Sequence, residues 1–337
     1  MTTMNFILKV CVSLVCFANA VCHGQVEKPW NPGVVTAFEN FNVIPMTDSI
    51  VLENQTVIVR GNEIAAIGPS ATIEIPENAV RIDGKNQKYL IPGLVDAHVH
   101  LHRKKSREWA TEFLSHGVTT VFNLKGNRKI LALRRKAQSG KVLAPNIYTS
   151  GPFIGAKTSW INKTSPKYME RLVLGQKKSG YDMIKIHGDL PLESYQHLME
   201  FSRSHQMFVM GHIPRNLSFQ DAINVRQLSL AHAEEMIYTQ FSRLDTAELD
   251  SFAVQAGEMG MWLSPTMTAF DKLSQSWGDP SVIDSLLELP ETKALHPALQ
   301  NIYRQDWYGS RDIAAKPFFQ KAYDFHQPLI CSMHNAG

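Results

Sequence analysis

The chain has 337 residues, of which 44% are hydrophobic and 19% are charged, and its formal net charge at pH 7 is +3. These values are typical of a soluble globular protein that can bury a large core. The small net charge, and the lack of Lys and Arg runs interleaved with aromatic residues, argue against a nucleic-acid partner. They favour a small-molecule or dipeptide substrate. The sequence gives no indication of the oligomeric state.

Residues 1–20 are predicted to be a cleaved signal peptide. Lys9 precedes an apolar run at 10–17, and Ala18-Asn19-Ala20 has the small-x-small pattern that signal peptidases cut. The run is too short to span a bilayer, so no stable membrane insertion is expected. A retained N-terminal anchor is the alternative. We therefore predict an exported protein, periplasmic or secreted.

Residues 21–88 are predicted to form an N-terminal β-sandwich segment. Short apolar runs are separated by turn residues, and Gly61-Asn62 between two of them favours a tight hairpin. The predicted strands are 34–38, 50–52, 56–60 and 64–68.

Residues 89–337 are predicted to form an α/β domain, because apolar strands alternate with amphipathic helical stretches. Eight such strands indicate a TIM (β/α)8 barrel. The long interval 267–327 is predicted to hold extra helices or a loop over the mouth of the site. The eight predicted strands are 90–100, 118–124, 146–150, 183–187, 207–212, 228–232, 261–264 and 328–331.

Two histidines at the end of the first of these strands are candidate metal ligands. His98 and His100 are separated by one residue, and side chains two apart in a strand point to the same side. Both imidazoles can therefore reach one point, as in half of a metal site. Two solvated histidines without function are the alternative, since such a short motif also occurs by chance.

Further candidate ligands lie within or at the end of three later predicted strands: Lys185, His212 and His232. Polar residues at the carboxyl ends of barrel strands converge on one cavity. Lys185 stands in an otherwise apolar strand, where a neutral amine could capture carbon dioxide as a metal-bridging carbamate. Pairing with Asp182, or extension of the side chain to the rim, is the alternative. Together these donors suit zinc or a similar metal.

Glu234 and Glu235 follow His232 directly. They could orient a metal ligand by hydrogen bonding, or they could cap the helix that follows.

With these residues in place, the chain resembles the amidohydrolase superfamily, in its imidazolonepropionase-like and prolidase-like branch. The segments that carry the resemblance extend over most of the chain after the signal: 57–69, 90–100, 117–124, 148–152, 180–190 and 211–235. The resemblance implies a distorted TIM barrel with an N-terminal β-sandwich, and hydrolysis of amide, peptide or cyclic amide bonds.

The resemblance also implies a centre of two divalent metal ions, with zinc the expected metal. His98 and His100 would hold the more buried ion, His212 and His232 the more exposed one, and carboxylated Lys185 would bridge them. A hydroxide shared by the ions would attack the substrate carbonyl. His187 falls where a substrate-contacting residue is expected, or it could be a structural histidine at the rim.

The resemblance breaks at the eighth strand, where members of the superfamily carry a proton-shuttling aspartate. Here Asn335 aligns with that aspartate, or His334 does after a shift of one residue. An amide cannot act as a base near neutral pH, whereas a histidine can. The resemblance thus implies an incomplete C-terminus for the barrel. A catalytically impaired relative that binds metal or ligand without turnover is the alternative function, and a mononuclear deaminase is a weaker third.

Overall fold

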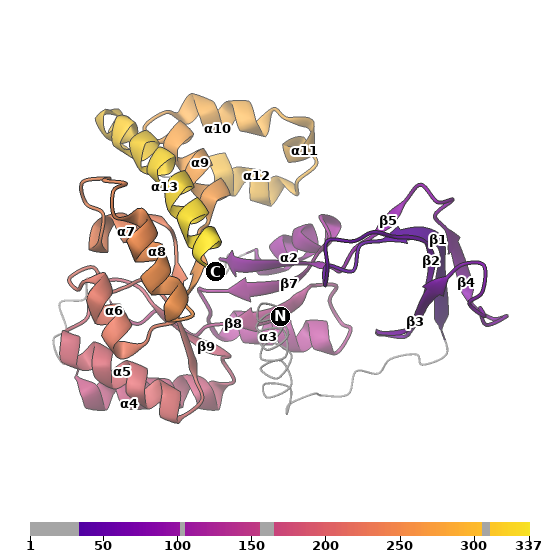
Figure 1. Ribbon diagram of the computed structural model, residues 1–337, viewed down its shortest axis with the longest axis horizontal. Coiled ribbons are helices and arrows are strands. Elements are labelled where there is room, and N and C mark those ends of the chain that lie inside the picture. Colours follow the sequence, from indigo (N-terminus) through magenta and orange to yellow (C-terminus); the bar gives the residue numbers. More distant parts are fainter. Residues whose placement is uncertain (1–33, 102–104, 156–164, 305–310) are drawn as a thin grey trace. The chain divides into compact units, whose positions relative to one another are not determined.

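The computed structural model describes residues 34–101, 105–155, 165–304 and 311–337. The predicted signal peptide at 1–20 lies outside the described residues. The described chain divides into two compact units (Figure 1): residues 34–94 with 138–142, and residues 95–137 with 143–337.

The first unit is a five-stranded sheet built around its first strand. β1 pairs antiparallel with β2, which pairs antiparallel with β3, while β4 and β5 both run parallel to β1. The predicted hairpin at Gly61-Asn62 is confirmed, since Arg60 and Glu63 pair across it and Gly61 has a φ of 81°. The strands are β1 (Val35–Val43), β2 (Leu52–Arg60), β3 (Glu63–Pro69), β4 (Val80–Asp83) and β5 (Tyr89–Leu90).

The described strands of this unit lie in one sheet, and the second sheet expected of a sandwich is not among them. Val35, Ala37 and Phe41 of β1 are buried, whereas Ile64 of β3 and Val80 of β4 are exposed. A sheet that buries apolar side chains on one face only leaves those of the other face in contact with solvent. The predicted strands 34–38, 56–60 and 64–68 therefore correspond to β1, β2 and β3, whereas 50–52 is not a separate strand because β2 begins at Leu52. The described strands do not show the two-layer packing.

The second unit contains seven of the eight strands predicted for the barrel. They form a three-stranded sheet of order β6-β7-β8 and a four-stranded sheet of order β9-β10-β11-β12. Parallel bridges from Ser150 to Met183 and from Ile154 to Ile186 connect the two sheets. The strands are β6 (Leu94–Val99), β7 (Val118–Asn123), β8 (Asn146–Thr149), β9 (Met183–Ile186), β10 (Phe208–Gly211), β11 (Ser229–Ala231) and β12 (Trp262–Ser264).

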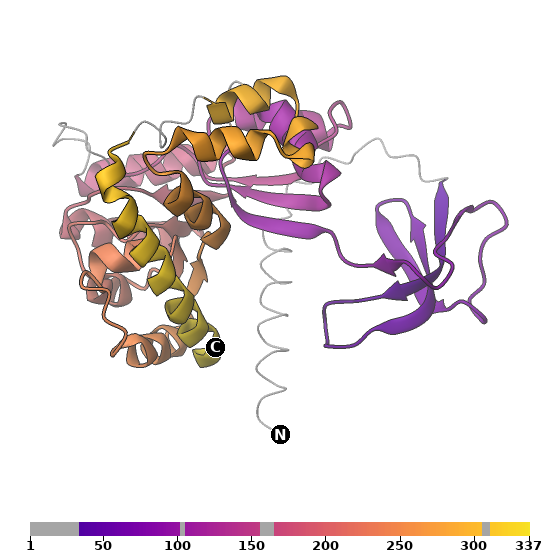
Figure 2. The ribbon, with the colours of Figure 1, turned by 90° about the horizontal axis from the view of Figure 1, so that it is seen from above.

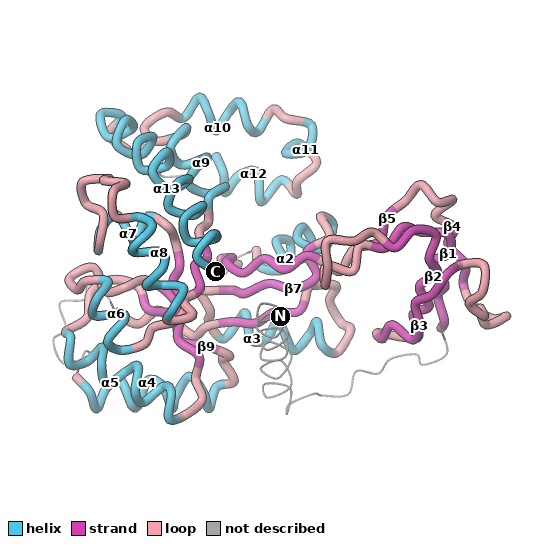
Figure 3. The backbone as a smooth tube through the Cα atoms, in the orientation of Figure 1, coloured by secondary structure: helices cyan, strands magenta, loops and turns pink. Residues whose placement is uncertain are grey.

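Helices follow most of these strands, as expected for βα repeats (Figure 3). The predicted insertion at 267–327 holds helices, as one of its two alternatives proposed. In the described parts of the chain, no helix is both long enough and apolar enough to cross a membrane. The helices are α2 (Ser106–Ser115), α3 (Arg128–Gln138), α4 (Pro166–Ser179), α5 (Leu192–Ser204), α6 (Phe219–Val225), α7 (Glu234–Thr239), α8 (Leu249–Glu258), α9 (Met267–Ser276), α10 (Pro280–Leu287), α11 (Pro290–Lys293), α12 (Pro297–Arg304), η2 (Ile313–Ala315) and α13 (Lys316–Ala336).

The eighth strand predicted at 328–331 is wrong, because these residues lie inside the 21-residue helix α13 (Figure 2). Ala322, Phe325, His326 and Leu329 are buried, at the spacing of one helix face and not in the alternation of a strand. A short apolar run cannot by itself distinguish the two structures. The described residues consequently form no closed eight-stranded barrel.

Replacing Leu329 with alanine is expected to lower the free energy of unfolding by about 2 kcal/mol. Leu329 is fully buried in the same apolar cluster as Phe241 and Phe252, so the truncation leaves a cavity. Urea unfolding measures the loss. Cys331→Ala, at an exposed position of the same helix, is the control and should change the stability by less than about 0.5 kcal/mol. Equal losses in both variants would contradict the helical assignment of this face.

Candidate metal centre

The second unit places the predicted site residues at the ends of four strands. His98 is the second-to-last residue of β6 and His100 follows that strand, Lys185 is in β9, His212 follows β10, and His232 follows β11. In a parallel sheet the carboxyl ends of the strands share one edge, which is where these side chains meet.

Ring contacts connect the four histidines that were predicted as metal ligands. The ring centroids of His98 and His232 are 4.3 Å apart, those of His98 and His100 5.4 Å, and those of His212 and His232 5.0 Å. A fifth ring, that of His187, lies 4.5 Å from His212. We call these five residues with Lys185 the histidine cluster.

Several nitrogens of the histidine cluster are buried without a hydrogen-bond partner. They are both ring nitrogens of His98, both ring nitrogens of His212, and Nζ of Lys185. One of them, His212 Nδ1, has a Glu235 oxygen 3.1 Å away, in a contact whose geometry is not that of a hydrogen bond. Leaving such groups unpaired is costly, and neutral imidazole and amine nitrogens are donors that metal ions accept. The donor set therefore fits a metal centre. Within the described ranges, however, no group of three or more His, Cys, Asp or Glu side chains is arranged so that it could hold a metal ion without rearrangement.

Lys185 is fully buried, within a strand whose four residues are all buried. Neither alternative explanation of this lysine holds. Asp182 instead accepts a hydrogen bond from Arg134 Nη1 at 2.6 Å and another from the Thr149 amide. Full burial also excludes extension of the side chain to the rim. Burial lowers the pKa of the Lys185 amine to about 7, so a large fraction is uncharged near neutral pH.

The histidines of the cluster are held neutral. Burial, followed by the charge of Lys185, lowers the pKa of His100 to about 4 and that of His232 to about 3. The same two causes lower the pKa of His98 and His212 still further. Neutral imidazole is the form that coordinates metal ions.

A buried carboxylate contacts His212. Glu235 Oε1 lies 3.1 Å from His212 Nδ1, and the Arg215 guanidinium donates to both carboxylate oxygens, with Nη2 to Oε1 at 2.7 Å and Nε to Oε2 at 3.4 Å. Ala233 is the N-cap residue of α7, and it makes no side-chain capping bond. Of the two roles that the sequence left open, the geometry of Glu235 matches orientation of a histidine.

His232 is also fixed by its surroundings. Its Nδ1 lies 2.9 Å from Thr266 Oγ1, and its amide donates to the carbonyl of Ser264 in β12. Both His232 and Thr266 have positive φ values, 72° and 54°.

Gly211 allows β9 and β10 to approach each other beside His212. Its φ is 132°, and a Cβ atom there would meet the backbone oxygen of Ile186 and lie 3.0 Å from Lys185 Cδ. Gly211→Ala is expected to lower the free energy of unfolding by about 2–3 kcal/mol, since backbone strain and overpacking add together.

Gly117→Ala is the matched control for this substitution. Gly117 also has a positive φ, 79°, but nothing lies within 4 Å of the added Cβ, so only the backbone strain remains, about 1 kcal/mol. Chemical denaturation of both variants measures the difference. A loss at Gly211 no greater than that at Gly117 would show that the strands can separate without cost.

His187, predicted to contact substrate, lies at the exposed edge of the cluster. Its ring stacks on Phe153 with centroids 4.6 Å apart and an interplanar angle of 9°. Lys125, which follows β7, places its ammonium 5.5 Å from the centre of the Phe153 ring. Arg215, Lys125 and Phe153 were not predicted; their only sequence signal is that each follows a strand-end segment.

The structure does not bring His334 or Asn335 to the cluster. Both are exposed in the last turn of α13, where the neighbouring Ser332 hydroxyl donates to Asp250 of α8. The predicted position at a strand end is wrong because the strand itself is a helix. α13 instead buries His326, whose ring lies 5.6 Å from that of Phe270 in α9.

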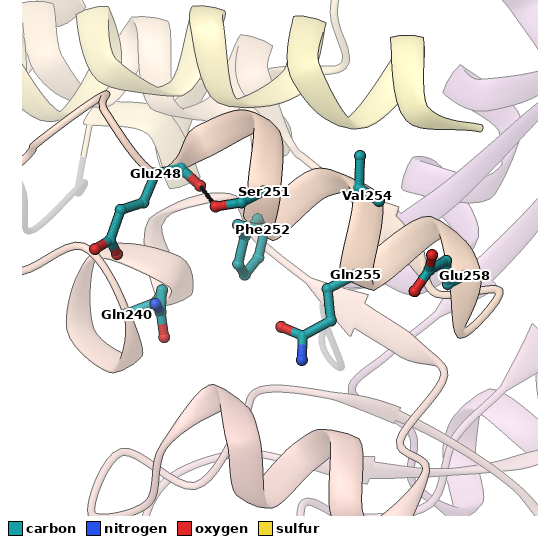
Figure 4. A pocket seen from close by; sticks show the side chains of 7 residues that line it. All are labelled: Gln240, Glu248, Ser251, Phe252, Val254, Gln255 and Glu258. Atoms are coloured by element: carbon teal, nitrogen blue, oxygen red, sulfur yellow. Dashed lines mark hydrogen bonds between the residues drawn. The ribbon is translucent and has the colours of Figure 1, made fainter.

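A separate pocket of about 350 Å³ lies beside α8 (Figure 4). None of the predicted site residues is among its lining residues, and these include no basic side chain. They are Gln240, Glu248, Ser251, Phe252, Val254, Gln255 and Glu258.

Several solved structures share the fold of this chain at low sequence identity. A prolidase complexed with N-methylphosphonate-L-proline matches with a TM-score of 0.66 and 15% identity over 90% of this chain and 76% of that one. A Xaa-Pro dipeptidase with bound methionine gives 0.58 and 17% over 90% and 84%. Bottromycin amidohydrolase gives 0.61 and 19% over 94% and 69%.

The sequence itself matches a known family over most of the second unit. A comparison with curated protein sequences finds no match. The model of the amidohydrolase family, in contrast, matches residues 89–301, which is more than half of the chain and includes the whole histidine cluster. On this evidence the chain belongs to the amidohydrolase family.

Proposed function

We propose that this protein is a metal-dependent hydrolase of amide bonds, with dipeptides or small amides, including cyclic ones, as substrates. One observation carries the proposal: His98, His212 and Lys185 bury nitrogens that have no hydrogen-bond partner, within one cluster at the strand ends. The family supports hydrolysis, and the prolidase and the Xaa-Pro dipeptidase among the structural neighbours support a peptide-like substrate.

The donors divide between two divalent ions, for which zinc is the expected metal. His98 and His100 would hold one ion, His212 and His232 the other, and Lys185, carboxylated, would bridge them. Bound there, the metals would supply an activated water as nucleophile and would polarise the substrate carbonyl.

The residues of the chain prepare this centre. Burial keeps the imidazoles neutral and leaves the Lys185 amine in part uncharged. Its nitrogen can then form a bond to the carbon of carbon dioxide, and the released proton passes to solvent. Glu235 holds the orientation of His212 and Thr266 that of His232.

A second candidate function is metal or ligand binding without turnover. It is favoured by the position of His334 and Asn335, which are exposed at the end of helix α13 and do not follow a strand of the second unit. The two candidates share the metal centre and differ only in hydrolysis.

Metal analysis and a substrate panel test both candidates. Chelator-treated protein is reloaded with zinc, bound metal is measured by mass spectrometry, and hydrolysis is followed on Xaa-Pro dipeptides, N-acyl amino acids and cyclic amides. We expect two ions per chain and hydrolysis that chelator abolishes. His98→Ala should lose both properties, and His116→Ala, at an exposed histidine after α2, should retain them. Bound metal without hydrolysis would select the second candidate. Absence of bound metal would refute the first candidate and would leave only the ligand-binding form of the second.

A further inference from the structure

We infer that Lys125 and the Phe153–His187 stack form a subsite for a substrate carboxylate, so that the preferred substrates are dipeptides or N-acyl amino acids with a free terminal carboxylate. This inference rests on the proposed function, because it deepens the description of the same site.

The base of Lys125 is held firmly. The preceding Leu124 is fully buried, and its amide donates to the carbonyl of Val99 in the β6 strand that carries His98. The following Gly126 packs so closely on Ser150 that a Cβ atom there would meet the Ser150 carbonyl. The lysine side chain itself is exposed.

Phe153 is held equally well on the other side. The next residue, Ile154, is buried; its amide donates to the Lys185 carbonyl at 2.9 Å, and its carbonyl accepts from the His187 amide at 2.8 Å. The Phe153 ring therefore presents one face to His187, while the Lys125 ammonium lies over the ring at 5.5 Å. His100 is also near, with its ring 6.1 Å from that of Phe153.

Among the described basic residues near the histidine cluster, Lys125 is the one whose charge remains available to a ligand. Lys185 is fully buried, and Arg215 is occupied by Glu235 and by the face of Tyr238 at 4.6 Å. In the described chain, no carboxylate forms an ion pair with Lys125.

The Lys125 ammonium and the stacked rings of Phe153 and His187 match the two groups of an amino acid that is released from an amide bond, its carboxylate and its side chain. An ammonium without an acidic partner favours a carboxylate, and the stacked rings of Phe153 and His187 offer an apolar wall for the adjoining side chain. A substrate whose carboxylate is blocked as an amide would lose the charged contact and keep the wall.

Paired ligands test the inference. Alanyl-proline and its C-terminal amide are compared as substrates of the zinc-loaded protein. Lys125→Met should lower kcat/KM for the acid about 10–100-fold, mainly through KM, and change that for the amide less than about twofold. Lys125→Arg should restore most of the loss, and Lys129→Met, at an exposed lysine four residues later, should have no effect.

Calorimetric titration of the same two ligands into chelator-treated protein measures binding where hydrolysis cannot occur. We expect wild type to bind the acid more tightly than the amide, and Lys125→Met to lose this preference. Absence of turnover with the preference intact would count against the proposed function alone. Equal affinity of the wild type for acid and amide, or an equal loss of both in Lys125→Met, would overturn the inference.

Discussion

Lys185→Met is expected to leave the protein with at most one bound metal ion and to reduce kcat/KM by about 10³-fold or more. Lys185 is the only non-histidine donor in the histidine cluster, and its amine has no hydrogen-bond partner among the described residues. Without a bridging ligand the second ion has only two imidazoles. Metal analysis with and without added bicarbonate measures this directly, since the carbamate requires dissolved carbon dioxide.

The same substitution is expected to stabilise the metal-free protein. Burial lowers the pKa of Lys185 from 10.5 to about 7, so between these values the unfolded chain binds more protons than the folded one. The free energy of unfolding therefore rises with pH from about 7 to 10.5, and below pH 7 the folded protein retains a buried ammonium. Lys185→Met removes this cost, which is about 2–5 kcal/mol.

Denaturant unfolding of chelated wild type and Lys185→Met at several pH values tests this. The difference between the two proteins should be largest at and below pH 7 and should shrink toward pH 10. Comparing them removes most of the contribution of titrating groups that do not interact with Lys185; Glu234, whose pKa burial raises to about 8, does interact with it and contributes to the difference. Lys129→Met serves as an exposed control.

In the metal analysis of the same variant, two ions bound to Lys185→Met would contradict the bridging role of Lys185.

Most of the cluster could be predicted because one rule governs it. Four of the predicted ligands come at the end of an apolar run, and the fifth is a charged residue inside such a run. Parallel strands bring their carboxyl ends to one edge of the sheet. The four are His98, His100, His212 and His232, and the fifth is Lys185. Burial of a lysine within a strand was equally visible, since its neighbours are Met183, Ile184 and Ile186.

The remaining features depend on tertiary contacts that no local pattern reveals. Pro328-Leu329-Ile330-Cys331 is apolar whether it forms a strand or a helix, and its packing against α8 and α9 determines the outcome. Arg215 and Lys125 look alike in the sequence, as basic residues in loops. Only the structure shows that one is bound by Glu235 and the other is not.

Glu235→Gln is expected to weaken metal binding about 10–100-fold, the range found when an outer residue that orients a metal-binding histidine is removed. The substitution keeps the size of the side chain but removes the charge that lies 3.1 Å from His212 Nδ1. A carboxylate favours a proton on Nδ1, which leaves Nε2 with its lone pair available to a metal. An amide can present its nitrogen instead, and the imidazole is then no longer held in that form.

Competition with a zinc-binding dye measures the dissociation constant of the weaker ion in wild type and variant. Glu200→Gln, at an exposed position of α5, is the control and should leave the constant unchanged. Arg215→Lys should give a smaller effect, because a lysine can hold Glu235 by one contact where the guanidinium makes two. If Glu235→Gln lowers only the free energy of unfolding and not the affinity for zinc, the pair stabilises the fold and does not position His212.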